Sequence, residues 1–332
     1  MLKDNFLRNH NYLRVSVTDK CNLRCRYCMP PEGVEFLPHD KILRNEDFAR
    51  IIGLFINMGI NKVRFTGGEP LVRNGIIDII STARSFSPNV ELCLTTNGIL
   101  LNQYADDLQK QGVKRINISL DTMSRSRFLD LTGRDYFDTV VSNIEKSIGS
   151  NFFNVKINTV LFSHTLEELD DFLDYFMDKN ITLRFIERMP VTEQDELNSF
   201  VPSDELIQAL KSKGKLTPVI KEASDVAMRY DIEYKNRKIK LGIIPPVTHR
   251  FCASCNRLRI TAEGNLRTCL YSNINYNLKE MLDRKANDNE LEKYIAKAIK
   301  EKQHGHNIEC TADNKGCRSI TCDIKAMSKI GG

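Results

Sequence analysis

The chain has 332 residues, of which 41% are hydrophobic and 27% charged, as in an ordinary globular protein with room for about two domains. Its net charge of +5 permits an anionic substrate, but the basic residues are too scattered to indicate a nucleic-acid groove. No apolar run is long enough for a membrane span or a signal peptide. We therefore expect a cytoplasmic protein with no membrane or nucleic-acid partner, whose ten cysteines are reduced thiols or metal ligands.

Strand-like and helix-like segments alternate through the first 190 residues. Apolar, β-rich segments predict strands at residues 12–18, 62–66, 90–95, 114–120, 153–161 and 182–186. Helical spacing of apolar residues predicts helices at 45–58, 75–86, 101–111, 136–148 and 166–177. Such β/α units favour a parallel sheet, and six of them are too few for a closed eight-fold barrel. We therefore expect an α/β fold with an incomplete (β/α)6 TIM-like barrel.

The alternation ends after Pro190. A predicted helix at 204–213 is followed by short strands around 230–244 and by helical segments from 278 to 302. We interpret residues 191–332 as a smaller α+β domain that follows a partial barrel of residues 1–190. The charged run at 235–240 is interpreted as a solvated hairpin.

A group of three cysteines follows the first predicted strand with the spacing C-x3-C-x2-C: Cys21, Cys25 and Cys28. Three thiolates are one ligand short of a complete site for either a structural zinc ion or a four-iron cluster. A cluster held in this way would keep one iron free to bind a reactive ligand. The spacing alone leaves both metals open.

A second group of three has the spacing C-x2-C-x13-C: Cys252, Cys255 and Cys269. With His249 this group could form a zinc knuckle of three cysteines and one histidine. Arg257 and Arg259, however, alternate on a predicted strand, so both can face one anion beside the metal. A structural zinc site does not need two such arginines.

Further motifs narrow the choice between a zinc site and an iron–sulfur cluster. The segment Phe65-Thr66-Gly67-Gly68-Glu69-Pro70 follows the second predicted strand, where two glycines let the backbone approach a ligand closely. With the first cysteine motif and its Tyr27, this segment resembles the radical S-adenosylmethionine (SAM) superfamily. With the second cysteine group, the Cys-Asn-Arg-Leu-Arg segment and the closing Gly331-Gly332, the chain is similar to the GTP 3′,8-cyclase family of molybdenum cofactor biosynthesis over nearly its whole length.

This resemblance implies two [4Fe-4S] clusters, one at each cysteine group, and SAM as a further cofactor. It implies that SAM is cleaved to a 5′-deoxyadenosyl radical, which removes the C3′ hydrogen of GTP so that C3′ bonds to C8 of guanine. The product would be (8S)-3′,8-cyclo-7,8-dihydroguanosine 5′-triphosphate. The implied partners are an electron donor and, as product acceptor, cyclic pyranopterin monophosphate synthase, with the enzyme as a monomer or homodimer.

The resemblance also assigns residues. Matching positions would bind SAM through Tyr27, Gly68, Ser119 and Met189. The positions that match GTP contacts are Arg14, Arg64, Thr95, Lys156, Arg257 and Arg259. Catalytic roles fall to Arg14, as a hypothetical proton donor, and to Gly331 and Gly332. Simpler alternatives are a turn for Gly68, a helix cap for Ser119, core filling for Met189 and surface ion pairs for the cations.

Two other functions fit part of the sequence. A peptide-modifying radical SAM enzyme with an auxiliary cluster would share the first motif, and a non-enzymatic zinc-binding module would share the cysteines. The late group Cys310, Cys317 and Cys322 lacks a tight pair, so we interpret it as surface or reactive thiols, with a third metal site as the alternative. Cys93 is interpreted as a small buried apolar residue.

Overall fold

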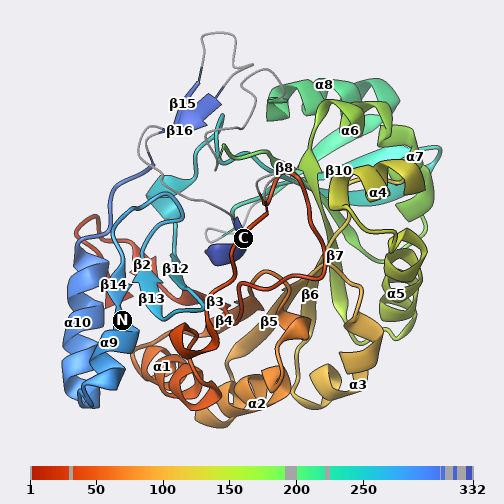
Figure 1. The fold of residues 1–332 in the computed structure, drawn as a ribbon. Coiled ribbons are helices and arrows are strands. Elements are labelled where there is room, and N and C mark those ends of the chain that lie inside the picture. Colours follow the sequence, from red (N-terminus) through yellow and green to blue (C-terminus); the bar gives the residue numbers. More distant parts are fainter. Residues whose placement is uncertain are drawn as a thin grey trace.

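The computed structural model describes residues 2–29, 33–190, 200–220, 225–306, 308–310, 317–319 and 327–330. A curved twelve-stranded sheet organises this part of the chain, with helices around its outer side (Figure 1). The strand order is β14-β13-β12-β3-β4-β5-β6-β7-β8-β11-β10-β9.

The middle of this sheet is the expected partial barrel. Its parallel strands are β3 (Tyr12–Ser16), β4 (Lys62–Thr66), β5 (Glu91–Thr96), β6 (Arg115–Ser119), β7 (Asn154–Leu161) and β8 (Thr182–Glu187). The helices between them are α1 (Asn45–Asn57), α2 (Ile76–Phe86), α3 (Leu101–Lys110), α4 (Arg125–Thr132), α5 (Phe137–Gly149), α6 (Ser163–Glu167) and α7 (Leu169–Phe176). The expectation of an incomplete (β/α)6 barrel is confirmed. The helix α4 was not predicted; it is short and largely polar, and is capped by the hydroxyl of Ser124.

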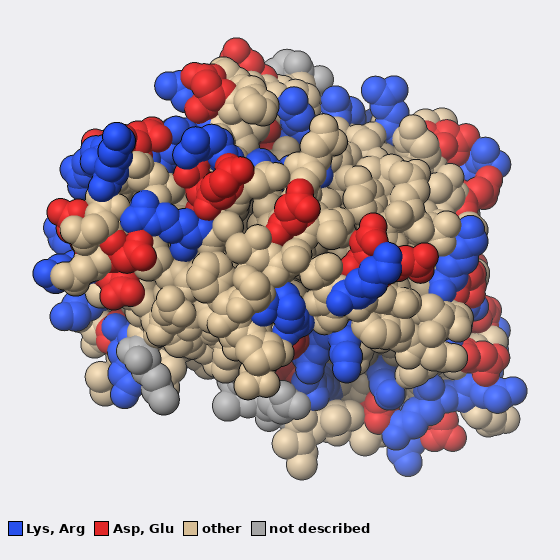
Figure 2. Space-filling view, turned by 90° about the horizontal axis from the view of Figure 1, so that it is seen from below, with Lys and Arg blue, Asp and Glu red and all other residues tan. Residues whose placement is uncertain are grey.

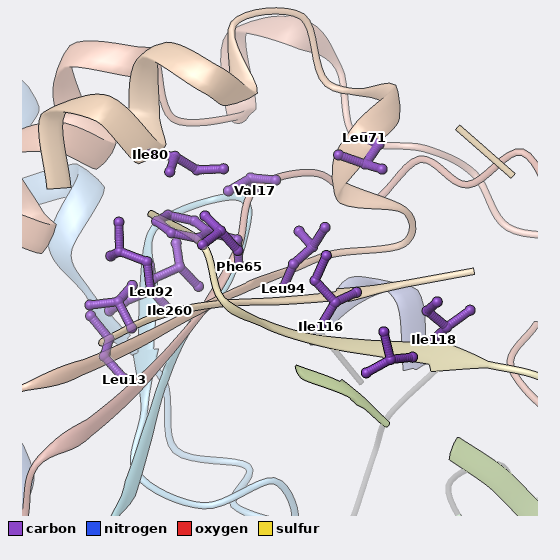
Figure 3. Packing of buried hydrophobic residues seen from close by; sticks show 14 of the residues in the cluster. Leu13, Val17, Phe65, Leu71, Ile80, Leu92, Leu94, Ile116, Ile118 and Ile260 are labelled. Atoms are coloured by element: carbon purple, nitrogen blue, oxygen red, sulfur yellow. The ribbon is translucent and has the colours of Figure 1, made fainter. Parts of the chain in front are cut away.

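Alternation along the strands separates an apolar outer face from a polar inner face. Leu13 of β3 and Phe65 of β4 are fully buried in the core, and Figure 3 shows Ile80 of α2 beside Val17 and Phe65. Because successive residues of a strand point to opposite faces, the neighbours of these apolar residues face the inside of the barrel. The inner face is therefore free to carry polar side chains.

Strands from after Pro190 extend both edges of the barrel. β11 (Arg237–Ile244) pairs in parallel with β8, and β12 (Arg257–Ile260) pairs in parallel with β3. The sheet continues beyond them through β10 (Met228–Tyr234) and β9 (Lys215–Val219) on one side, and through β13 (Asn265–Arg267) and β14 (Tyr276–Asn277) on the other. These strands thus cover the unpaired backbone edges that a six-stranded partial barrel would expose.

The remaining elements lie around this sheet. The helices are α8 (Ser203–Lys213), α9 (Leu278–Asp283) and α10 (Asp288–Lys300), and the 3-10 turns are η1 (His39–Lys41), η2 (Pro70–Val72), η4 (Cys252–Ser254) and η5 (Met327–Lys329). Two hairpins pair β1 (Leu2–Lys3) with β2 (Asn9–His10), and β15 (Ile308–Cys310) with β16 (Cys317–Ser319). No described helix is long and apolar enough to cross a membrane.

Several smaller expectations can be compared with the structure. The charged run at 235–240 does lie at the β10–β11 hairpin, where the side chains at the turn are exposed. Lys and Arg are interspersed with Asp and Glu on the face shown in Figure 2, as a net charge of +5 suggests. Cys93 is fully buried, as predicted. Cys310 is paired in register with Cys317, whereas Cys322, Gly331 and Gly332 lie outside the described residues.

Candidate active site

A cavity of about 470 Å³ lies against the inner face of the sheet. Every predicted site residue within the described part of the chain lines it, including both cysteine groups. These residues are far apart in the sequence. They meet in the structure because parallel strands bring their carboxyl ends to one mouth of the barrel. The cavity therefore unites the motifs that the sequence analysis singled out.

The first cysteine group lies on a hydrogen-bonded loop after β3. The backbone N–H of Cys28 donates to the carbonyl oxygen of Cys25 at 3.0 Å, and the side-chain amide of Asn97 lies 3.8 Å from Cys21 Sγ. Burial raises the pKa of the Cys25 thiol well above its usual range, and the charges of Cys28 and Asp121 add to the shift. Burial thus favours the neutral thiol of Cys25 over its thiolate.

The second cysteine group lies among cations. The N–H of Cys255 donates to the carbonyl oxygen of Cys252 at 3.1 Å, which closes the turn η4. Burial opposes ionisation of Cys255, but Arg257 and Lys302 outweigh it and lower the pKa of its thiol to about 6. Cys25 thus lies near a carboxylate, whereas Cys255 lies near two cations.

His249 does not belong to this site. Its Nε2 atom lies 3.0 Å from Oδ1 of Asp204, and its side chain is half exposed. Among the residues that the structure describes, no three His, Cys, Asp or Glu side chains converge closely enough to ligate a single metal ion. Structural zinc needs four ligands on one ion, whereas a four-iron cluster distributes its thiolates over separate irons. With His249 hydrogen-bonded to Asp204, each group offers three thiols, which leaves a zinc ion one ligand short but suffices for three irons of a [4Fe-4S] cluster.

The glycine segment is hydrogen-bonded to the backbone that leads into the first cysteine loop. Gly68 N donates to the carbonyl oxygen of Thr18 at 2.7 Å, and Glu69 N donates to that of Lys20 at 2.8 Å. A Cβ atom on Gly68 would lie 2.4 Å from the Lys20 carbonyl oxygen, so only glycine fits there. The carboxylate of Glu69 accepts hydrogen bonds from the Asn97 N–H at 2.7 Å and from the Thr96 hydroxyl at 2.8 Å. Burial raises the pKa of Glu69 to about 7.

The other residues predicted to contact SAM lie on the same cavity. Tyr27 donates from its hydroxyl to Asp121 Oδ2 at 2.6 Å, and burial raises the pKa of this tyrosine well above its usual range. Ser119 does not cap the following helix, since the N-cap residue of α4 is Ser124. Met189 lines the cavity and also packs on a small apolar cluster, so part of its side chain does fill the core.

Cations from neighbouring strands lie side by side on the inner face of the sheet and line the cavity. Arg14 of β3 is in register with Arg64 of β4 on one side and with Arg259 of β12 on the other. Arg64 is 5% exposed and Arg259 is 7% exposed, so neither forms a surface ion pair. Burial lowers the pKa of Arg14 to about 10, and the nearby Arg64 and Arg257 contribute to the shift. Such a cluster of buried cations is costly unless it binds an anion.

Further hydrogen bonds and charges surround these arginines. Arg64 donates to the Tyr12 hydroxyl at 2.7 Å and to the Thr95 hydroxyl at 3.2 Å. Burial, together with the charge of Arg184, lowers the pKa of Lys156 to about 8. Arg184 itself was missed by the sequence analysis, although it lines the cavity and donates to Asn158 Oδ1 at 2.6 Å. The alternation of apolar and polar residues along the strand Thr182–Glu187 could have identified it.

The comparisons with known proteins agree with this arrangement. Residues 15–176 match the family model of the radical SAM superfamily, and residues 181–308 match that of Molybdenum Cofactor Synthesis C. A solved structure of Streptococcus suis SuiB bound to S-adenosylmethionine has a similar fold, with a TM-score of 0.62 and 16% identity over 96% of this chain and 78% of that chain. The chain is thus a radical SAM protein.

Similar proteins of known name identify the family to which the chain belongs. The GTP 3′,8-cyclase of Desulforamulus reducens is 40% identical over 99% of both chains. The GTP 3′,8-cyclases of Clostridium perfringens and Petrotoga mobilis are 37% and 38% identical, over 100% and 99% of this chain and of the respective relative. The protein belongs to the GTP 3′,8-cyclase family.

Proposed function

We propose that the protein converts GTP into (8S)-3′,8-cyclo-7,8-dihydroguanosine 5′-triphosphate, the first step of molybdenum cofactor biosynthesis. The observation that carries this proposal is one cavity lined by two cysteine groups and by several arginines and a lysine from neighbouring strands, of which Arg64 and Arg259 are buried. A metal-binding module has no need of such cations, whereas a triphosphate does. Family membership supports the same reaction.

The cysteine groups would hold two [4Fe-4S] clusters. Residues 1–190 would carry the first cluster at Cys21, Cys25 and Cys28, and residues 191–332 the second at Cys252, Cys255 and Cys269. When bound and reduced, the first cluster supplies the electron for SAM cleavage, which is chemistry that side chains cannot provide. Tyr27, Gly68, Ser119 and Met189 would then orient SAM against the first cluster.

The chain's own residues would bind and position GTP. Arg14, Arg64, Thr95, Lys156, Arg257 and Arg259 would contact it, and each charge-assisted hydrogen bond contributes about 1.5–3 kcal/mol. The walls of the barrel would keep water and other C–H bonds away from a reactive radical, and would hold the ribose within reach of it. Arg14 would hold the proton that the cyclised product needs. Arg14→Lys should then lower product formation at unchanged GTP affinity.

The tail would complete the site. Met327 lines the cavity and its N–H donates to the carbonyl oxygen of Cys28 at 3.1 Å, so η5 lies inside the curve of the sheet (Figure 1). Gly331 and Gly332, which follow this turn, would act at the substrate. Their deletion should leave both clusters and SAM cleavage largely intact but abolish the cyclised product. A truncated protein with full cyclase activity would contradict that role.

The partners follow from the reaction. We place the enzyme in the cytoplasm as a monomer or homodimer, reduced by an external electron donor. Its product would pass to cyclic pyranopterin monophosphate synthase.

The decisive experiment measures 5′-deoxyadenosine formed by the anaerobically reconstituted protein with SAM and a strong reductant, with and without GTP. A large GTP-dependent rise with consumption of GTP would support the proposal. Slow SAM cleavage that GTP does not change would retain the radical chemistry but reject GTP as substrate, which favours a peptide-modifying radical SAM enzyme instead.

A further inference from the structure

A buried lysine lies against the second cysteine group. Lys302 follows α10 and is only 3% exposed. Its Nζ atom lies 3.6 Å from Cys255 Sγ and 2.8 Å from the carbonyl oxygen of Arg257. Within the described part of the chain, no carboxylate lies within ion-pairing distance of this ammonium group. Its nearest acidic group is therefore the thiol of Cys255.

The position of Lys302 is fixed by its neighbours. The helix α10 is anchored by buried apolar side chains, including Ile295 and Ile299, and the Lys302 N–H donates to the Ile299 carbonyl oxygen at 3.1 Å. Arg8 then ties the following residues to the cysteine loop. Its guanidinium donates to the carbonyl oxygens of Gln303 at 2.7 Å, His304 at 2.8 Å and Cys252 at 2.8 Å.

A buried ammonium group is expensive, so its placement beside a sulfur calls for a compensating interaction. A neutral thiol gives little compensation, whereas a metal-bound thiolate is a full negative charge that an adjacent cation stabilises strongly at low dielectric. Hydrogen bonds to the sulfurs and nearby charge are among the factors that set the reduction potential of an iron–sulfur cluster.

The first cysteine group has the opposite surroundings. Its neighbours include the buried carboxyl groups of Glu69 and Asp121, whose ionised forms disfavour the thiolates of Cys21 and Cys25. Arg24 also acts on Cys21, but its side chain is exposed to solvent, which screens its charge. A buried lysine therefore distinguishes the second group from the first.

We propose that Lys302 raises the reduction potential of the second cluster above that of the first. An added electron makes a cluster more negative, and a fixed buried cation stabilises that more negative state. The strongly reducing potential is thereby kept at the cysteine group beside which SAM must be cleaved. The inference rests on the proposed second cluster, but not on GTP as the substrate.

The test compares reduction potentials in full-length, anaerobically reconstituted protein by redox titration followed with electron paramagnetic resonance. The signal that changes when SAM is added belongs to the first cluster. A protein with alanine at Cys21, Cys25 and Cys28 identifies the signal of the second. Iron and sulfide analyses establish that each variant carries its clusters.

Lys302→Met should lower the equilibrium constant for reduction of the second cluster at least tenfold, which is about 59 mV for a one-electron couple, and leave the first cluster unchanged. Lys302→Arg, which keeps the positive charge, should retain most of the wild-type reduction potential of the second cluster. Lys300→Met is the matched control, because Lys300 ends the same helix but is exposed, and it should change neither potential. If Lys302→Met loses the cluster, Lys302→Gln is compared with Lys302→Arg in its place.

An unchanged second potential in the uncharged variants, or an equal shift of both clusters, would overturn the inference. If the wild-type protein binds only one cluster, both the role of Lys302 and the assignment of a second cluster are wrong. The assay of GTP-dependent 5′-deoxyadenosine is run in parallel. A shifted potential in a protein that ignores GTP would reject the proposed substrate and leave the role of Lys302 standing.

Discussion

Gly68→Ala tests how closely the glycine segment and the first cysteine loop are packed. The added Cβ atom would lie 2.4 Å from the carbonyl oxygen of Lys20 and 2.7 Å from that of Asp19. Both atoms belong to the backbone that leads into Cys21, so neither can rotate away as a flexible side chain would. The segments must separate, which weakens the hydrogen bond from Gly68 N to Thr18 O at 2.7 Å.

The cost can be estimated from these two effects. Overpacking a close contact costs about 1–3 kcal/mol, and a lost backbone hydrogen bond adds about 1 kcal/mol. We expect the free energy of unfolding of the metal-free protein to fall by about 2–4 kcal/mol, measured by urea denaturation under anaerobic conditions. Because the displaced backbone carries Cys21, iron should also be lost from the first cysteine group and retained at the second.

Gly149→Ala is the matched control. No heavy atom lies within 4 Å of a Cβ built on Gly149, which ends the helix α5. This variant should be as stable as the wild type or more stable by about 0.4–1 kcal/mol. A Gly68→Ala protein with the wild-type unfolding midpoint and a full complement of iron would refute the packing argument.

Three further predictions concern single buried groups. Tyr27→Phe removes the hydroxyl that donates to Asp121 Oδ2 and leaves this carboxylate with the Val160 N–H, which donates to Oδ1 at 2.8 Å. The variant should lower the free energy of unfolding by about 1–3 kcal/mol in urea denaturation, and an unchanged value would contradict this role of the hydroxyl. Lys156→Met should weaken GTP binding about 10- to 150-fold, measured by calorimetry. The affinity of the wild type for GTP should also fall as the pH rises through about 8, where Lys156 loses its proton. The same pH dependence in the variant would contradict a role of Lys156 in GTP binding. The pKa of Glu69 is about 7 in the folded protein and about 4.5 in the unfolded chain, so the free energy of unfolding should decrease as the pH rises between these values. The Glu69→Gln protein, compared with the wild type at pH 5 and 7.5, should lack this decrease.

The sequence was sufficient to predict the parts of the fold that depend on local pattern. The strand Lys62–Thr66 and the helix Asn45–Asn57 have the periodicity of their structures, and their predicted bounds agree with the observed ones within a residue. Motif residues at the ends of parallel strands could also be expected to meet, since parallel strands share one carboxyl edge. Gly68 and Ser119 do line the same cavity.

The features that the sequence did not reveal depend on distant partners. The strands Arg237–Ile244 and Arg257–Ile260 were assigned to a separate part of the chain, yet Leu241 is in register with Leu183 and Leu258 with Leu13. Nothing in the local pattern of a strand identifies which distant edge it will join. Lys302 escaped notice for the same reason, because only the folded chain brings it to Cys255.

The pairing of β12 with β3 has a consequence for how the protein is made. The strand β3 ends at Ser16, but its neighbour on one side ends only at Ile260, about 244 residues later in the chain. At typical translation rates of about 5–20 residues per second, that edge waits for roughly 12–50 seconds. During this time one edge of β3, which leads into the first cysteine loop, has no partner strand. Closure of this strand edge is therefore a late step, which must wait until residues 257–260 have left the ribosome.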